Sequence, residues 1–315
     1  MRWLLAAALA SALPGPLLAR DDPALTRLQQ RDGQLFAVGW RLVAANAPFC
    51  AGAAPALGLS ILDAGAFARP DAVRRQLGLS GDLAIGALAP GSPAARAGLA
   101  VNDTLLAVNG APVAAGFPAG KPAWQRLVTV TAALGEAAAA GEVVLEVAGP
   151  GAAPRIVRLA AVPACPTRFE VLDSGGKAMA EGARVIFGRD FAGFAYPEEE
   201  FASAVAHELA HNLLGHRTAL DANGRRLGNV RATEREADRL MPWLLANAGY
   251  DPEAALRFMR RWGPRHGGGL LRARSHEGWD ERAAAIAAEV TLVREALAAE
   301  GKADWARRFR REALD

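Results

Sequence analysis

Apolar residues recur at helical spacing near the start of the chain, over residues 24–50. This spacing predicts one amphipathic helix that ends at Ala47-Pro48. From Ala51 onward Gly, Ala and Pro become frequent, and the apolar residues gather in short runs that are typical of strands. The predicted strands are 57–62, 83–88, 104–108, 143–147 and 156–159, and one amphipathic helix near 123–139 lies among them.

The pattern changes again after Cys165. Two further predicted strands, 168–172 and 183–187, lead into a half of the chain with helical periodicity. In the second of these strands Val185 and Phe187 share one face, which either contacts a substrate or packs into the core. A β-rich segment therefore interrupts a mainly helical one, which predicts an α+β fold with two domains.

The composition excludes several classes of protein. Of the 315 residues, 51% are hydrophobic and 22% are charged, so the chain is too apolar to be disordered. Two cysteines cannot form a disulfide-rich scaffold. The formal net charge is only +3, and neither a long basic run nor a nucleic-acid-binding motif accompanies it. We therefore expect no nucleic acid partner.

The first residues have the pattern of a secretory signal peptide. A basic start, Met1-Arg2, precedes an apolar run to Leu13 and a small residue, Ala19. We expect residues 1–19 to be cleaved, which would leave a periplasmic or secreted protein that is soluble or peripherally associated with a membrane. An uncleaved membrane anchor is the alternative, although the run is short for a bilayer span.

The segment from Pro90 to Gly110 combines a tight turn, one helical turn of small residues, a strand and an Asn-Gly turn. Its sequence, PGSPAARAGL followed by VNDTLLAVNG, resembles the bacterial form of the PDZ domain, and the resemblance covers roughly 54–160. PDZ domains bind extended peptides by strand addition. The resemblance implies that a peptide lies beside the helix that carries Gln125 and Val128, although a spacer or lid is the alternative. The implied peptide-binding loop is Leu57, Gly58, Leu59 and Ser60.

The most informative motif is the pentapeptide His207-Glu208-Leu209-Ala210-His211. On a helix the two histidines lie 40° apart because each residue turns about 100°. Two imidazoles so placed can share a Zn²⁺ ion, and Glu208 can accept a proton from a water molecule. The alternative is a surface helix with two unrelated histidines.

A catalytic zinc site needs a third protein ligand. We expect Glu234 to supply it, because Glu234 and Asp238 are four residues apart on one face of a predicted helix, so that Asp238 can orient a ligand imidazole. His216 lies about 180° around the helix from His207, which predicts a capping or surface histidine. For Glu236 and its neighbour Arg235 we expect a solvated helix face.

These motifs resemble those of the HtpX-like and CAAX-prenyl-protease-like zinc metalloendopeptidases, which are gluzincins. That family has HExxH, then ExxxD, then a GYDP segment, here 249–252, and later a histidine followed by Arg282. The resemblance covers 24–50 and 165–300, and it implies a zincin-type peptidase domain formed by 20–53 and 163–315, with 54–162 as an inserted PDZ domain. It also implies that His276 approaches the metal or stabilises an oxyanion. An ordinary loop histidine is the alternative.

The motifs together predict an exported zinc-dependent metalloendopeptidase with one Zn²⁺ per chain. We expect its partners to be protein or peptide substrates and its role to be quality control of envelope proteins. We expect strand 183–187 to be the sheet edge that holds the substrate. Two other functions stay open, both with zinc closed by His276: a non-catalytic adaptor or chaperone, and an auto-inhibited protease.

Two further features bear on partners and on export. Arginines without intervening acids are frequent between Glu253 and Glu277 and again near the end of the chain. They are either solvated helix faces or a surface for an anionic membrane or an envelope assembly partner. Cys50 and Cys165 flank the β-rich segment, and the ends of an insertion should lie close together, which predicts a disulfide. Two buried thiols are the alternative.

Overall fold

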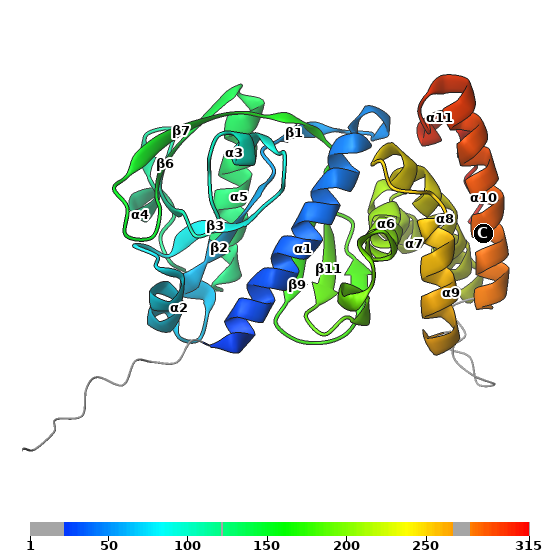
Figure 1. Ribbon diagram of the computed structural model, residues 1–315, viewed down its shortest axis with the longest axis horizontal. Coiled ribbons are helices and arrows are strands. Elements are labelled where there is room, and N and C mark those ends of the chain that lie inside the picture. The colour runs from blue at the N-terminus through cyan, green and yellow to red at the C-terminus, as the bar shows by residue number, and fades with distance from the viewer. Residues whose placement is uncertain (1–21, 121, 267–277, 315) are drawn as a thin grey trace, which may run out of the picture.

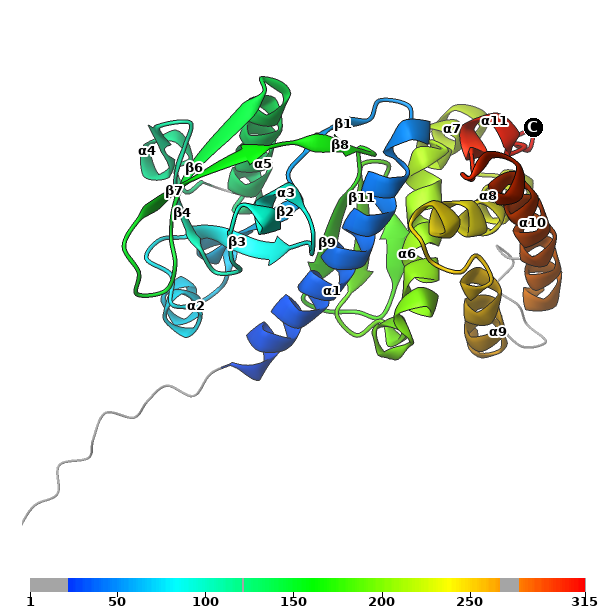
Figure 2. The same ribbon diagram turned by 45° about the horizontal axis from the view of Figure 1, so that its top comes forward.

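The computed structural model describes residues 22–120, 122–266 and 278–314, which form a β-rich half and a helical half (Figure 1). The first helix, α1 (Pro23–Ala45), runs between them and contacts a sheet of each half (Figure 2). The predicted signal peptide and His276 lie outside the described residues. The expected helix over 24–50 is shorter than predicted, because Asn46 caps it and a 3₁₀ turn, Ala47–Phe49, follows.

The β-rich half is a six-stranded sheet with the order β2-β3-β4-β6-β7, in which β5 pairs with β4. Every neighbouring pair is antiparallel. Alternate residues of β6 are buried, and together with one face of helix α5 they form a core of their own. The strands are β2 (Leu59–Asp63), β3 (Leu83–Leu88), β4 (Thr104–Val108), β5 (Ala111–Pro112), β6 (Glu142–Ala148) and β7 (Arg155–Ala160). The helices are η2 (Ala64–Ala66), α2 (Pro70–Leu77), α3 (Pro93–Arg96), α4 (Val113–Gly116) and α5 (Trp124–Ala139).

The two halves are joined by a short pair of strands and a disulfide. Strand β1 (Ala54–Ala56) enters the β-rich half and pairs antiparallel with β8 (Val162–Ala164), which leaves it. Just outside this pair Cys50 and Cys165 form a disulfide with a Cα–Cα distance of 5.6 Å, which confirms the predicted pairing.

The helical half holds a three-stranded sheet in the order β10-β11-β9. Its strands are β9 (Arg168–Leu172), β10 (Ala178–Ala180) and β11 (Arg184–Gly188). The prediction that 183–187 forms the edge of this sheet is wrong, because β11 pairs with a neighbour on both sides. Val185 and Phe187 are fully buried, so their face belongs to the core. Among the described residues, β10 and β9 are the two edge strands of this sheet.

Helices pack on this sheet and on one another around one apolar core. The helices are η3 (Ala192–Ala195), α6 (Glu198–Leu213), α7 (His216–Asn223), α8 (Leu227–Asn247), α9 (Ala254–His266), α10 (Trp279–Glu300) and α11 (Trp305–Arg308). Helices α6 and α8 pack closely on each other, and this brings together the histidines of α6 and the carboxylates of α8. Within the described ranges, no helix is both long and apolar enough to cross a membrane.

Candidate metal centre

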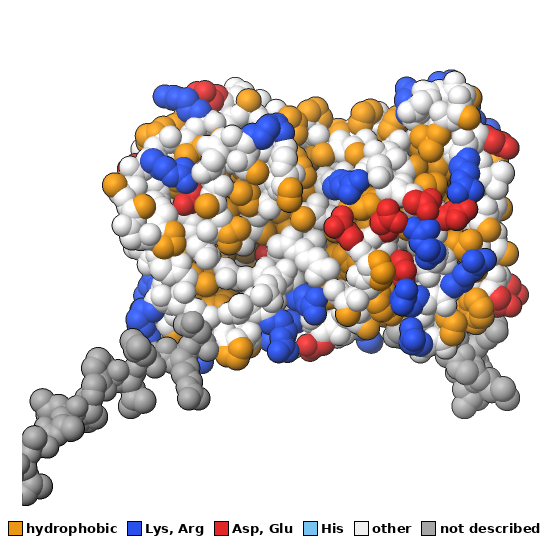
Figure 3. Space-filling view, in the orientation of Figure 1, with side chains coloured by type: hydrophobic (Ala, Val, Ile, Leu, Met, Phe, Trp, Pro, Cys, Tyr) orange, Lys and Arg blue, Asp and Glu red, His pale blue; other side chains and the backbone are white. Residues whose placement is uncertain are grey.

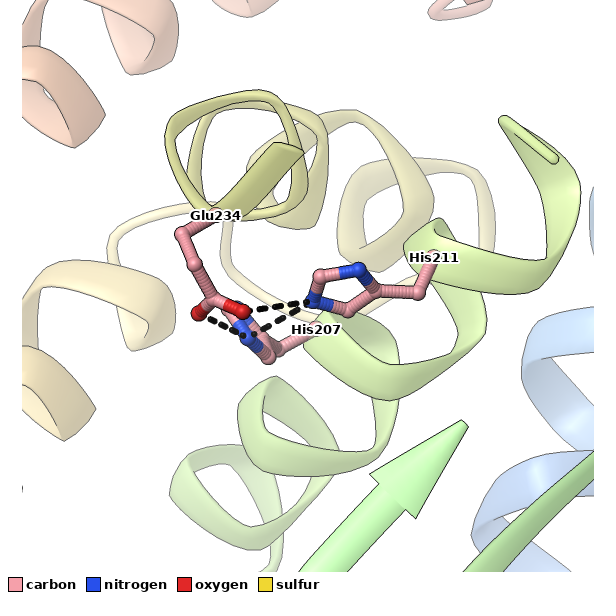
Figure 4. A group of neighbouring side chains, drawn as sticks. All are labelled: His207, His211 and Glu234. Atoms are coloured by element: carbon pink, nitrogen blue, oxygen red, sulfur yellow. Dashed lines mark hydrogen bonds and ion pairs between the residues drawn. The ribbon is translucent and has the colours of Figure 1, made fainter. Parts of the chain in front are cut away.

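Helix α6 carries both motif histidines. Its apolar side chains, among them Phe201, Val205 and Leu209, are fully buried in the core. His207 and His211 therefore project from the opposite side, where their rings face Glu234 of α8 (Figure 4).

The three candidate ligands converge on one point. The Nε2 atoms of His207 and His211 are 3.3 Å apart, and oxygens of Glu234 lie 3.5 Å from the first and 3.6 Å from the second. Ligand atoms held about 2.0–2.2 Å from a tetrahedral zinc ion lie about 3.4 Å from one another. Among the described residues, this is the one group of His, Cys, Asp and Glu side chains spaced to hold a metal ion.

The electrostatics of the centre favour a positive charge between the histidines. Burial opposes protonation of His207, but hydrogen bonds to Asp238 and Glu234 outweigh it and raise the pKa of His207 to about 10. Burial and the charge on His207 lower the pKa of His211 to about 3. A divalent metal ion bound by these groups would take the place of a proton on His207.

Asp238 contacts the His207 ring on the side that faces away from the centre. An oxygen of Asp238 lies 3.1 Å from Nδ1 of His207, so that Nε2 faces the centre. Arg282 of α10 donates two hydrogen bonds to the same carboxylate, at 2.5 and 2.7 Å. Burial alone would raise the pKa of Asp238, but Arg282 outweighs it and keeps the pKa below its usual range. Of the later residues in the family pattern, Arg282 is thus placed at the centre.

His216 is not the capping or surface histidine that helical geometry predicted. Helix α6 ends at Leu213, and Gly215, with a φ of 66°, separates it from α7, which begins at His216. His216 is therefore brought back against the centre, where it is 1% exposed and its Nδ1 lies 2.8 Å from Nδ1 of His211. His216 is therefore not related to His207 by the turn of a single helix, because the two residues belong to α7 and α6.

The expected solvated face at Glu236 and Arg235 is also wrong. Glu236 is fully buried, and one of its oxygens lies 3.0 Å from Nε2 of His216. Its hydrogen bonds to His216 and Arg311 outweigh its burial and lower the pKa of Glu236 to about 2. Arg235 pairs with Glu312 at 3.0 Å. No local pattern in the sequence points to these contacts, because His216 belongs to α7 and the other partners, Arg311 and Glu312, lie more than 70 residues away along the chain.

A cleft of about 790 Å³ opens on the centre. Glu208 lines it together with the three candidate ligands, and β10 forms one of its walls. Aromatic side chains line another part of the cleft: Phe191, Phe258, Trp262 and Trp279. The cleft can therefore hold an extended chain beside a free strand edge, with apolar side chains directed against the aromatic wall.

The predicted peptide loop of the β-rich half lies where its sheet begins. Leu57 and Gly58 precede β2, and their carbonyls accept hydrogen bonds from Ala94 and Ala89, while Leu59 and Ser60 open the strand itself. Strand β2 is at the edge of the sheet, and α5 lies beside it. Two large apolar side chains of α5 are exposed, Trp124 at 62% and Val128 at 41%, and Val128 is one of the residues predicted to lie beside a bound peptide.

The arginines of the helical half mostly have acidic partners. Arg257 pairs with Glu199 and Asp251, Arg261 pairs with Glu200, and Figure 3 shows acidic and basic side chains interleaved on this face. The basic stretch itself contains no acidic residues, and its partners Glu199 and Glu200 belong to α6. Arg272 and Arg274, which also belong to the basic stretch, lie outside the described residues.

Comparison with known families finds one match. The family model of the PDZ domain matches residues 85–130, which run from β3 into α5. A search of curated proteins finds no match to the chain. The β-rich half thus contains a PDZ domain, a type of domain that recognises proteins or peptides.

Proposed function

We propose that this protein is a zinc-dependent metalloendopeptidase of the zincin type, with a PDZ domain that recognises its protein substrates. One observation carries the proposal. The side chains of His207, His211 and Glu234 have the mutual spacing of three zinc ligands, and Glu208 lies beside them in an open cleft. The signal-like start and the Cys50–Cys165 disulfide support export to the periplasm or beyond, because disulfides persist in oxidising compartments.

Each residue has a chemical role in this proposal. His207, His211 and Glu234 would hold the ion, which would supply a Lewis acid that polarises a carbonyl and lowers the pKa of a bound water molecule to about 7. The Glu208 carboxylate accepts a proton from the attacking water and passes it to the leaving amine nitrogen. Asp238 keeps a proton on Nδ1 of His207, so that Nε2 is free to bind the metal.

The substrate backbone pairs with the free edge of β10, beside the aromatic wall of the cleft. The PDZ domain holds another part of the same substrate at the edge of β2. A substrate that engages both sites is bound with a high effective concentration at the cleft. Envelope proteins that expose extended segments would meet this requirement.

A non-catalytic adaptor or chaperone is the second candidate, with His276 closing the metal site as a fourth ligand. The two candidates differ in the coordination of the ion, because a catalytic zinc site keeps one position free for water or substrate and the adaptor's site would not. An auto-inhibited protease would differ from both, since His276→Ala would then raise its activity.

The test is the substitution Glu208→Gln. We expect it to abolish zinc-dependent casein hydrolysis and to leave one zinc ion bound per chain, because it removes the proton acceptor and no metal ligand. Glu295→Gln, an exposed glutamate on α10, is the control and should keep wild-type activity. Full activity of the Glu208→Gln protein would refute the mechanism, and bound zinc without any hydrolysis by the wild-type protein would favour the adaptor.

A further inference from the structure

His216 and Glu236 form a continuous chain of contacts behind one candidate ligand. Nδ1 of His216 lies 2.8 Å from Nδ1 of His211, and Nε2 of His216 lies 3.0 Å from an oxygen of Glu236. His216 is 1% exposed and Glu236 is fully buried. Water therefore does not compete for these contacts. Each N–H group of the two histidines that faces this series of contacts must donate to a protein acceptor.

The direction of these hydrogen bonds follows from the metal. When His211 binds the ion through Nε2, its proton must sit on Nδ1, and that N–H must donate. His216 must then accept at Nδ1, which places its own proton on Nε2, where it donates to the carboxylate of Glu236. One arrangement of protons satisfies all three groups, and it fixes the tautomer and the ring plane of His211.

The position of Glu236 on α8 explains why a second imidazole lies between the carboxylate and the ligand. Asp238 follows Glu234 by one helical turn, so both face α6 and Asp238 reaches His207 directly. Glu236 is about 200° around the helix from Glu234 and points away from the centre. His216 spans the gap between Glu236 and His211.

The end of the chain holds Glu236 in place. Its second oxygen accepts hydrogen bonds from Nε of Arg311 and from the backbone N–H of Glu312, both at 2.7 Å. The Glu312 side chain returns to α8, where it accepts from Arg235 at 3.0 Å. Arg239 of the same helix lies over the ring of Phe309, 5.1 Å from its centroid. Residues 309–312 are thus fastened to the helix that carries Glu234.

We propose that His216 and Glu236 are positioning residues for the metal ligand His211, and that the C-terminal segment 309–312 completes this support through Arg311. The proposal rests on the proposed zinc site. The zinc affinity of this protein then depends on residues at the end of the chain that never touch the metal.

The first test compares two substitutions of His216 by the dissociation constant for zinc, measured in competition with a chelator. His216→Phe fills the space without an acceptor and should weaken zinc binding about 10–100-fold. His216→Asn places an oxygen near the position of Nδ1 and should keep most of the affinity. Thermal unfolding of the metal-free proteins reports any purely structural effect. Equal zinc affinity of the Phe and wild-type proteins would overturn the proposal.

A second pair of variants changes two exposed arginines, so this test does not require a buried site to tolerate a substitution. Arg311 is half-exposed, with 46% of its side chain accessible, and Arg310 beside it is exposed. Arg311→Ala should weaken zinc binding about tenfold, and Arg310→Ala should not. If both variants bind zinc like the wild type, this inference fails and the proposed zinc site stands. If the wild type binds no zinc, the proposed function fails and this inference fails with it.

Discussion

Burial changes the proton affinity of single side chains well away from the metal centre, and Asp32 is the clearest case. Asp32 belongs to α1, where that helix packs on β9, and burial raises the pKa of its carboxyl to about 6, with the charge of Glu170 adding to the effect. The folded protein therefore binds this proton more tightly than the unfolded chain, so stability is lost as the pH rises from about 4 to 6.

Asp32→Asn should remove that loss. We expect the variant to be more stable than the wild type by about 2 kcal/mol above pH 6.5, less than the full shift implies because Asp32 is only partly buried. Below pH 4 the two proteins should be equally stable, since the carboxyl is then protonated. Urea unfolding at both pH values measures the difference, with Asp173→Asn as an exposed control. A stability difference that is the same at both pH values would contradict the assignment.

The side chains that the sequence placed at the centre share helical periodicity. His207, His211, Glu234 and Asp238 could be predicted because each pair lies on one face of a helix, and geometry within a helix follows from spacing. The sequence predicted His216 wrongly, because α6 ends before Gly215 and helical spacing does not carry over into the next helix. His276 stays a prediction, because it lies outside the described residues.

Secondary-structure elements with a strong apolar pattern were predicted closely. Strands β3 and β4 have the predicted bounds, because each is a mostly buried apolar run between turn residues. Strand β9 also has the predicted bounds, although Phe169 is its one buried residue. Helix α2 was missed, since Pro70 opens it and only two of its residues are buried. The role of β11 was wrong because pairing on both sides depends on β10, a three-residue strand with too little pattern to predict.

Helix α5 and strand β2 support one prediction about substrate recognition. A peptide that pairs with the edge of β2 would contact the exposed Val128, so Val128→Asp should place a charge in an apolar contact. We expect casein hydrolysis to fall about tenfold and cleavage of a short fluorogenic peptide to stay unchanged, because only the longer substrate reaches both sites.

Leu292→Asp is the matched control for this prediction, because Leu292 is a similarly exposed apolar residue on α10. It should leave both rates unchanged. A Val128→Asp protein that hydrolyses casein as fast as the control would leave the PDZ domain without a role in substrate capture.

The disulfide joins the two points at which the chain enters and leaves the β-rich half. Cys50 and Cys165 close a loop of 115 residues that contains the β-rich half. In the chain-entropy treatment such a loop contributes roughly 4–5 kcal/mol by restricting the unfolded chain. We expect Cys50→Ser with Cys165→Ser to lower the free energy of unfolding by about that amount. Denaturant unfolding of the variant and of the wild type, with and without reductant, measures it, and a wild type insensitive to reduction would contradict the expectation.

At the scale of the whole molecule, α1 lies between a half that contains a PDZ domain and a half that holds the candidate metal centre. The proposed function depends on the metal. X-ray absorption at the zinc edge of the loaded protein tests it directly. We predict two imidazole nitrogens, one carboxylate and one water oxygen around zinc, with distances of about 2.0–2.2 Å. A third imidazole in place of the water would contradict an open catalytic site and would favour closure by His276.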